Sequence, residues 1–198
     1  MLFREREAIR LRKALSAREL AFAGMGAALM AASAWISVPS LLPSMVPFTM
    51  QTFGVCLIGA VLGLRLGLWS VCSYILLGAV GVPVFSLFRG GLTVLAGPTG
   101  GYIIGFIFTV LAVGIVSDRG NGSFWPMLLS MAAGTALCYA FGTVWFVHVY
   151  ARTKGPIGVG AALGMCVVPY LIPDGIKIVL AALLTRRLRP LVRKAMGK

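Results

Sequence analysis

The stretch Pro173-Asp174-Gly175-Ile176-Lys177 places two ionisable side chains in a part of the chain that is otherwise almost entirely apolar. Asp174 and Lys177 are three residues apart, so on a helix they share a face about one turn apart. Ionisable groups inside a membrane segment are costly and usually face a cavity, a partner or a ligand. The stretch therefore predicts a membrane protein with a buried polar pocket. The alternative is an internal ion pair that only locks helix packing.

The composition supports one integral membrane domain. Of the 198 residues, 59% are hydrophobic and 12% are charged, and the mean hydropathy is +0.95. Soluble domains carry roughly twice that charged fraction. The length leaves room for about six spans of ~20 residues with short loops. We expect an all-α integral membrane protein with a basic N-terminal segment (1–19), a six-helix membrane domain (20–188) and a basic tail (189–198).

The net charge of +13 is concentrated at the two ends of the chain. Six basic residues precede the first apolar segment and six follow the last one. Basic clusters that flank membrane segments mark cytoplasmic ends, so both termini are predicted to be cytoplasmic. Nucleic acid is not an expected partner, because no aromatic-interleaved basic surface lies between the clusters. If the chain crosses the membrane six times, only three basic residues lie on the outer side: Arg89, Arg152 and Lys154.

The breaks in the apolar sequence predict where the six spans lie. Arg65 marks a tight turn between two short spans, and Pro169 and Pro173 interrupt the sequence before the last helix. The segment 157–169 is either the outer half of a kinked sixth helix or a re-entrant piece, and we favour the kinked helix. The predicted spans cover about 20–38, 52–64, 67–80, 102–116, 124–150 and 174–188.

Two irregular stretches are predicted to meet Asp174 and Lys177 toward the outer side. One is Pro47-Phe48-Thr49-Met50-Gln51, and the other is Gly97-Pro98-Thr99-Gly100-Gly101. Membrane proteins build binding sites where broken backbone lies beside charge. A Gln amide offers a donor and an acceptor, and a glycine-rich helix start allows close approach of a ligand. The alternatives are a helix-capping Gln51 and an ordinary tight turn.

The residues needed for catalysis are missing from the sequence. No GxxxxGK[ST] motif occurs, so the chain cannot hydrolyse ATP by that route. With one histidine and five acidic residues, no nucleophile–base constellation can be assembled. The four cysteines are scattered singly, so neither a disulfide framework nor a metal site is expected. A membrane enzyme acting on lipid would need a reactive constellation, and a pure scaffold would leave Asp174 and Lys177 paired only with each other.

A stripe of small residues marks the first span. Ala23, Ala27 and Ala31 recur at four-residue spacing, with Gly24 and Ala28 alongside. Such stripes let helices approach closely. The stripe is either internal packing or a docking face for a partner subunit.

Four segments taken together resemble a known family. Pro47-Phe-Thr-Met-Gln51-Thr-Phe-Gly54, Gly81-Val-Pro-Val-Phe85, Gly97-Pro-Thr-Gly-Gly-Tyr102 and Pro173-Asp-Gly-Ile-Lys177 occur in that order at fitting distances. The chain resembles the BioY family, the biotin-specific substrate-binding subunits (S-components) of energy-coupling-factor (ECF) transporters. The resemblance covers roughly residues 20–188. It implies a six-helix S-component that binds biotin, or a closely related vitamin or precursor, near the outer face and is not itself an enzyme.

The resemblance also implies partners and a location. A transmembrane coupling subunit and two cytoplasmic ATPases would drive delivery of biotin inward, in the cytoplasmic membrane of a bacterium or archaeon. The implied ligand is biotin, and no cofactor is expected. Ala23, Ala27 and Ala31 match the typical docking stripe on the first helix.

The ligand's chemistry suggests roles for eight residues. Lys177 is expected near the biotin carboxylate or another ligand oxygen, and Asp174 as an acceptor from a ligand N–H. Arg89 is expected either to steer the anionic substrate or to face lipid headgroups. The remaining expected contacts are Thr49, Gln51 and Tyr102 as polar lining and Phe48 and Phe85 as apolar walls.

Overall fold

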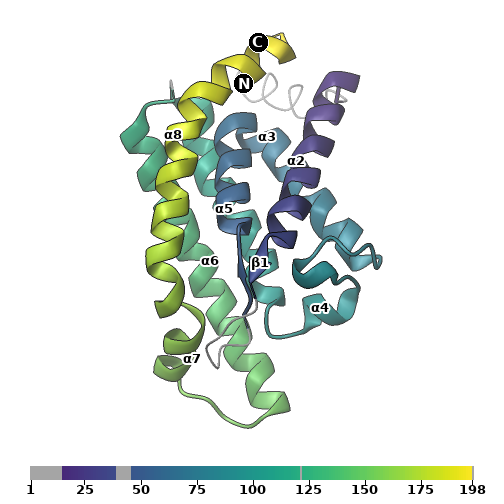
Figure 1. The fold of residues 1–198 in the computed structure, drawn as a ribbon, viewed down its shortest axis with the longest axis vertical. Helices are drawn as coiled ribbons and strands as arrows, with labels where there is room; N and C mark the ends of the chain where they lie inside the picture. Colours follow the sequence, from purple (N-terminus) through teal and green to yellow (C-terminus); the bar gives the residue numbers. More distant parts are fainter. Residues whose placement is uncertain (1–14, 39–45, 121, 198) are drawn as a thin grey trace, which may run out of the picture.

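The computed structural model describes residues 15–38, 46–120 and 122–197, which form a bundle of long helices (Figure 1). The predictions for the basic residues before residue 15 lie outside these described residues. Four helical segments among the described residues are long and apolar enough to cross a membrane: Gln51–Ala79, Gly100–Arg119, Phe124–Thr153 and Val159–Met196. The last of these is a broken helix. The all-α membrane fold class is confirmed.

Helix α2 (Ala17–Trp35) begins at a capping box. Ser16 accepts a hydrogen bond from the Glu19 N–H, and the Glu19 carboxylate accepts one from the Ser16 N–H. These bonds satisfy two of the backbone donors that a helix start leaves free. The helix leads into strand β1 (Ser37–Val38), which pairs antiparallel with β2 (Phe48–Thr49).

Helix α3 (Gln51–Ala79) is a hairpin of two arms that meet at Gly63. The backbone there has φ 78° and ψ −175°, a conformation that glycine tolerates and other residues avoid. Beyond Gly63 the chain folds back on itself. The closeness of the two arms shows this: a Cβ on Gly67 would lie 3.5 Å from the Gly59 Cα. In a continuous helix, residues eight positions apart are about 12 Å apart. Two short helices therefore meet next to Arg65, as predicted.

The linker after α3 is ordered and packs against the end of α2. It contains a 3-10 turn, η1 (Ser86–Phe88), and a short helix, α4 (Leu92–Ala96). The Trp35 indole donates a hydrogen bond to the Pro83 carbonyl at 2.9 Å and stacks on Phe88, with ring centroids 5.2 Å apart.

Helices α5 (Gly100–Arg119) and α6 (Phe124–Thr153) pack tightly against each other, and α5 also packs against α3. Small residues make this approach possible. A Cβ on Gly105 would lie 2.8 Å from the Cys138 Sγ, so the α5–α6 contact has no room for a larger residue there.

The last part of the chain is a broken helix. Helix α7 (Val159–Cys166) and the turn η2 (Val168–Tyr170) lead into α8 (Leu171–Met196). This agrees with the kinked sixth helix that we favoured. Pro173 was predicted to precede the helix, but it lies in the first turn of α8. The missing N–H of proline breaks no helical hydrogen bond at that position. The helix also continues beyond its predicted end near residue 188, to Met196.

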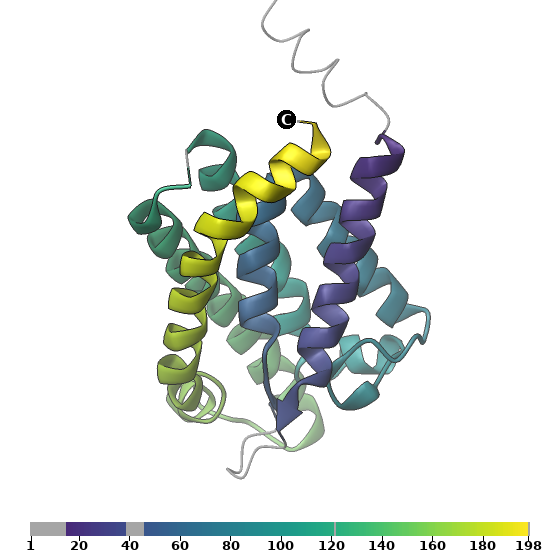
Figure 2. The ribbon, with the colours of Figure 1, turned by 45° about the horizontal axis from the view of Figure 1, so that its top comes forward.

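One end of the bundle gathers the turns that were predicted to share a side. The Leu64 N–H donates to the Asp118 carboxylate at 3.1 Å, and Arg189 donates to the carbonyls of Ser117 and Gly120. In two views, α2 begins and α8 ends at this same end (Figures 1 and 2). In the part of the chain that the structure describes, the two arms of α3, together with α2, α5, α6 and α8, are six long helical segments. The six predicted membrane crossings stay a prediction.

Candidate functional site

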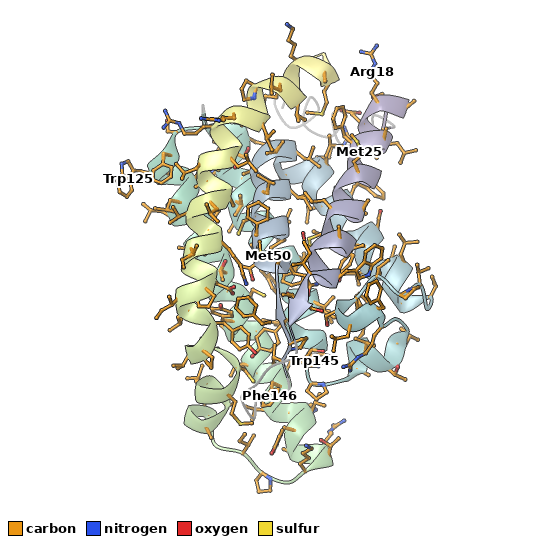
Figure 3. All side chains as sticks on the ribbon, in the orientation of Figure 1. Arg18, Met25, Met50, Trp125, Trp145 and Phe146 are labelled. Atoms are coloured by element: carbon orange, nitrogen blue, oxygen red, sulfur yellow. The ribbon has the colours of Figure 1, made fainter. Side chains whose placement is uncertain are left out.

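A cavity of about 70 Å³ lies in the half of the bundle away from that end. The starts of α3, α5 and α8 and the middle of α6 supply its walls. Figure 3 gives the orientation: Arg18 and Trp125 lie toward the end where α2 begins, and Trp145 and Phe146 toward the opposite end. The cavity is lined by polar side chains of Thr49, Gln51, Thr52, Tyr139, Asp174 and Lys177, among others.

Asp174 is only 4% exposed, and three side chains on helices bind its carboxylate. Its Oδ1 lies 2.7 Å from the Lys177 Nζ. Its Oδ2 accepts hydrogen bonds from the Thr52 hydroxyl at 3.0 Å and the Tyr139 hydroxyl at 2.5 Å. A buried carboxylate is tolerated only when it is paired and hydrogen-bonded, and both of its oxygens are engaged here.

Lys177 is also 4% exposed, and its ammonium contacts three different groups. Besides Asp174, it donates to the Thr49 carbonyl at 2.6 Å. It also lies over the Phe48 ring, 3.9 Å from the centroid, as in a cation–π contact. Thr49 and Phe48 belong to β2, so Lys177 ties α8 to the strand that precedes α3. The prediction that the two charges meet this irregular stretch is confirmed.

Gln51 and Thr49 form a small network at the start of α3. The Thr49 hydroxyl donates to the Gln51 side-chain oxygen at 3.1 Å and accepts from the Gln51 N–H at 3.3 Å. The Gln51 amide nitrogen donates to the Tyr74 hydroxyl at 2.8 Å. The Gln51 side chain therefore connects Thr49 to Tyr74 and lines the cavity.

Tyr102 lies in the cavity wall, as the sequence predicted, whereas Phe48 was predicted as an apolar wall but does not line the cavity. Tyr102 is on the first turns of α5, lines the cavity and shares a hydrogen bond of 3.2 Å with the Thr143 hydroxyl. Thr99, which precedes α5, lines the cavity as well, so the predicted glycine-rich stretch reaches it. Phe48 stacks on Tyr170, with centroids 6.1 Å apart, and covers the Lys177 ammonium.

Two more of the predicted contacts, besides Phe48, do not line the cavity. Phe85 is fully buried against Gly78 and lies edge-on to Tyr74, with centroids 5.4 Å apart. It fixes the linker to α3 and does not line the cavity. Arg89 is exposed, and its backbone pairs with Phe85 in an isolated bridge. Arg89 therefore does not contact the site, and its predicted role in steering substrate stays untested.

The predicted docking stripe on α2 is also corrected. Ala23, Ala27 and Ala31 are only 3%, 6% and 6% exposed, and α3 is the helix against which α2 packs most extensively. These alanines serve internal packing, the alternative that the sequence left open. Three exposed small residues lie one position after them: Gly24, Ala28 and Ala32.

Several cavity residues were missed. Tyr139 and Thr52 bind Asp174 directly, while Tyr170 and Thr135 complete the polar lining. A tyrosine in the middle of an apolar span was a usable signal for Tyr139, because a buried hydroxyl needs a partner. The cysteines Cys138 and Cys166, expected to be ordinary core residues, also lie in the cavity wall.

The site is built for binding. It presents a carboxylate that accepts, an ammonium that donates, and several hydroxyls that can do either. Apolar walls come from Val55, Ile103 and Phe106. Such a mixture of apolar lining and a few fixed polar groups is typical of small-molecule sites.

The comparisons with known proteins agree with this geometry. The chain matches the BioY family over residues 7–194. It is 42% identical to "Biotin transporter BioY" of Thermotoga maritima, covering 88% of this chain and 97% of that protein. It is 35% identical to "Probable biotin transporter BioY" of Pyrococcus horikoshii, covering 88% and 98%.

A solved structure shares the fold. It is described as the crystal structure of the S-component for biotin from an ECF-type ABC transporter. The TM-score is 0.78 at 23% identity, over 89% of this chain and 95% of that one. The fold, the matched family segment and the relatives all agree, and the chain belongs to the BioY family.

Proposed function

We propose that the chain is the non-catalytic, substrate-binding membrane subunit of an ECF-type importer, and that its cavity captures biotin. One observation carries the proposal: in a chain of the BioY family, Asp174 and Lys177 are buried together in the wall of a cavity. A scaffold without ligand gains little from burying a charge pair, because desolvation offsets much of the attraction between the charges.

The cavity lining offers partners for the two rings of biotin. The ureido ring of biotin offers two N–H donors and a carbonyl, and its thiophane ring is apolar. Asp174 accepts from a ligand N–H, and the Lys177 ammonium binds a ligand oxygen. Thr49, Gln51 and Tyr102 supply further polar contacts. The thiophane ring packs on the apolar wall of Val55, Ile103 and Phe106.

The transport step needs partners. A chain without a phosphate-binding Walker motif relies on other subunits to couple ATP hydrolysis to movement of the ligand. We infer a transmembrane coupling subunit and two cytoplasmic ATPases, acting in the cytoplasmic membrane of a bacterium or archaeon. The basic end of the bundle faces the cytoplasm, since basic residues are enriched on that side of membrane proteins. The coupling subunit then meets the exposed face of α2, which carries Ala28 and Ala32.

The experiment is a calorimetric titration of the purified protein in detergent. Biotin is compared with dethiobiotin, a precursor that lacks the sulfur bridge, and with thiamine and riboflavin as unrelated vitamins. The proposal expects saturable binding of biotin and no measurable binding of thiamine or riboflavin. A folded protein that binds no biotin would overturn the assignment of the ligand. If dethiobiotin binds more tightly than biotin, the ligand is the precursor and not biotin.

A further inference from the structure

A second cleft, unrelated to the biotin cavity, lies at the basic end of the bundle. It has a volume of about 820 Å³ and lies between the start of α6 and the second half of α8. Its wall includes Trp125 from α6 and Arg186, Arg189 and Arg193 from α8. The biotin cavity shares none of these residues.

The cleft is strongly basic. Arg186, Arg189 and Arg193 follow one another at spacings of three and four residues, so they share one face of α8. Among the residues that the structure describes, no acidic side chain lines the cleft. The nearby Asp118 is turned to α3, where it accepts a hydrogen bond from the Leu64 N–H at 3.1 Å. Three guanidinium groups therefore face one space without a carboxylate in its wall.

Arg189 has unused hydrogen-bonding capacity in this wall although it is only 4% exposed. Its Nη2 donates to the carbonyls of Ser117 and Gly120, which end α5. Its Nε has no hydrogen-bond partner among the residues that the structure describes. A buried donor without a partner is unusual and marks a place where an acceptor is expected.

The start of α6 borders the same cleft. Ser123, Phe124 and Trp125, the cap and first two residues of this 30-residue helix, line it. The Ser123 side chain makes no capping bond. The free N–H groups and the helix dipole at such an end favour an anion, most of all a phosphate.

The rim of the cleft is apolar. Trp125 is 68% exposed and Leu183 is 49% exposed. Figure 3 shows Trp125 projecting outward from the bundle at this end. Exposed tryptophans of membrane proteins lie at headgroup level, with their rings against lipid.

We propose that this cleft binds a phosphate group, held by Arg186, Arg189 and Arg193 together with the start of α6. Arginine matches phosphate well, because its planar donors can bind two oxygens at once. A phospholipid headgroup or a free phosphate ester could supply the group. The apolar rim of Trp125 and Leu183 favours a phospholipid, whose chains would lie against it.

The test uses the full chain, purified and delipidated in detergent. Binding of phosphatidylglycerol is measured by native mass spectrometry, with phosphatidylcholine as the zwitterionic comparison, and glycerol 3-phosphate is offered as the free ester. We expect phosphatidylglycerol to bind at least tenfold more tightly than phosphatidylcholine. Retention of phosphatidylglycerol alone assigns the site to lipid, and binding of glycerol 3-phosphate assigns it to free phosphate esters. Binding of neither anion would overturn the proposal.

Matched variants separate a built site from general electrostatic attraction. Arg186→Gln/Arg193→Gln removes two charges from the cleft, and Arg187→Gln/Lys194→Gln removes two from the same helix end outside it. A hydrogen bond to a charged group is worth roughly tenfold or more in affinity, so the cleft variant, which loses two arginines that bind the phosphate, should bind about a hundredfold more weakly, and the control variant should lose much less. Equal losses in the two variants would overturn the proposal. Neither pair includes Arg189, whose bonds to α5 make folding depend on it, and helix content by circular dichroism checks both variants.

Discussion

The Tyr139 hydroxyl on α6 donates a hydrogen bond of 2.5 Å to the Asp174 Oδ2 on α8. The same carboxylate oxygen accepts from Thr52 on α3, and Oδ1 pairs with Lys177. One buried carboxylate therefore connects three helices of the bundle and faces the cavity between them. A ligand that exchanges hydrogen bonds with Asp174 also changes the contacts between these helices.

Removing the Tyr139 hydroxyl tests its part in binding. We expect Tyr139→Phe to weaken biotin binding, because Asp174 loses a hydroxyl that orients its carboxylate at the cavity, and to lower stability by about 1.5–3 kcal/mol, the worth of a hydrogen bond to a charged group. Tyr150→Phe is the control: Tyr150 is on the same helix, packs on Phe146 and does not line the cavity. Calorimetry measures both. Equal affinities of Tyr139→Phe and the wild type would show that Asp174 does not need this donor.

The two members of the ion pair should depend on each other for stability. Asp174→Asn or Lys177→Met alone leaves one buried charge without its partner, which costs about 3–5 kcal/mol. The double variant removes both charges, so we expect it to be less destabilised than the sum of the single variants. Thermal unfolding in detergent, followed by circular dichroism, gives the comparison. Strictly additive losses would mean that the two side chains contribute independently.

The sequence was sufficient for the features that depend on charge and on backbone breaks. The hairpin of α3 was predicted from Arg65, a lone charge that has to reach the end of a membrane helix. The meeting of Thr49, Gln51, Thr99, Asp174 and Lys177 was predicted because charges and irregular backbone cannot face lipid. Exposing a charge or an unpaired backbone group to lipid is costly in every membrane protein.

The features that depend on which helix face points inward could not be predicted in the same way. In water, the buried face of a helix is the apolar one, but in a membrane lipid and protein core are equally apolar. Ala27 and its neighbour Ala28 therefore look alike in sequence, although only Ala27 is buried. For the same reason nothing placed Phe85 in the core rather than in the cavity wall. Only packing decides such positions.

Ala27 and Ala28 provide a matched pair for testing that packing. We expect Ala27→Trp to destabilise the protein by about 1–3 kcal/mol or more, because a buried position in contact with α3 cannot take a large ring. Ala28→Trp should fold normally and bind biotin, but reduce uptake in cells that supply the coupling subunit and ATPases. Thermal unfolding and uptake of labelled biotin are the two measurements. Equal stability of the two variants would contradict the assigned face of α2.

Gly63 should be essential to the α3 hairpin. Gly63→Ala would place a Cβ 2.2 Å from the Asp118 Oδ1 in a backbone conformation with φ 78°. We expect a loss of stability of about 1–3 kcal/mol from the backbone alone. Gly160→Ala in α7 is the control, because nothing lies within 4 Å of its Cβ and the residue is helical. If both variants unfold at the wild-type temperature, the turn is not where the structure places it.

The assignment of the cavity is tested most directly by the affinity of Lys177→Met for biotin. Arg89→Met, which removes an exposed cation outside the cavity, is the control for charge. The measurement is calorimetric titration of both variants, after gel filtration and circular dichroism have shown that they are folded. The account predicts that Lys177→Met loses biotin binding while Arg89→Met retains the wild-type affinity. Wild-type affinity in folded Lys177→Met would contradict the account and place the ligand elsewhere.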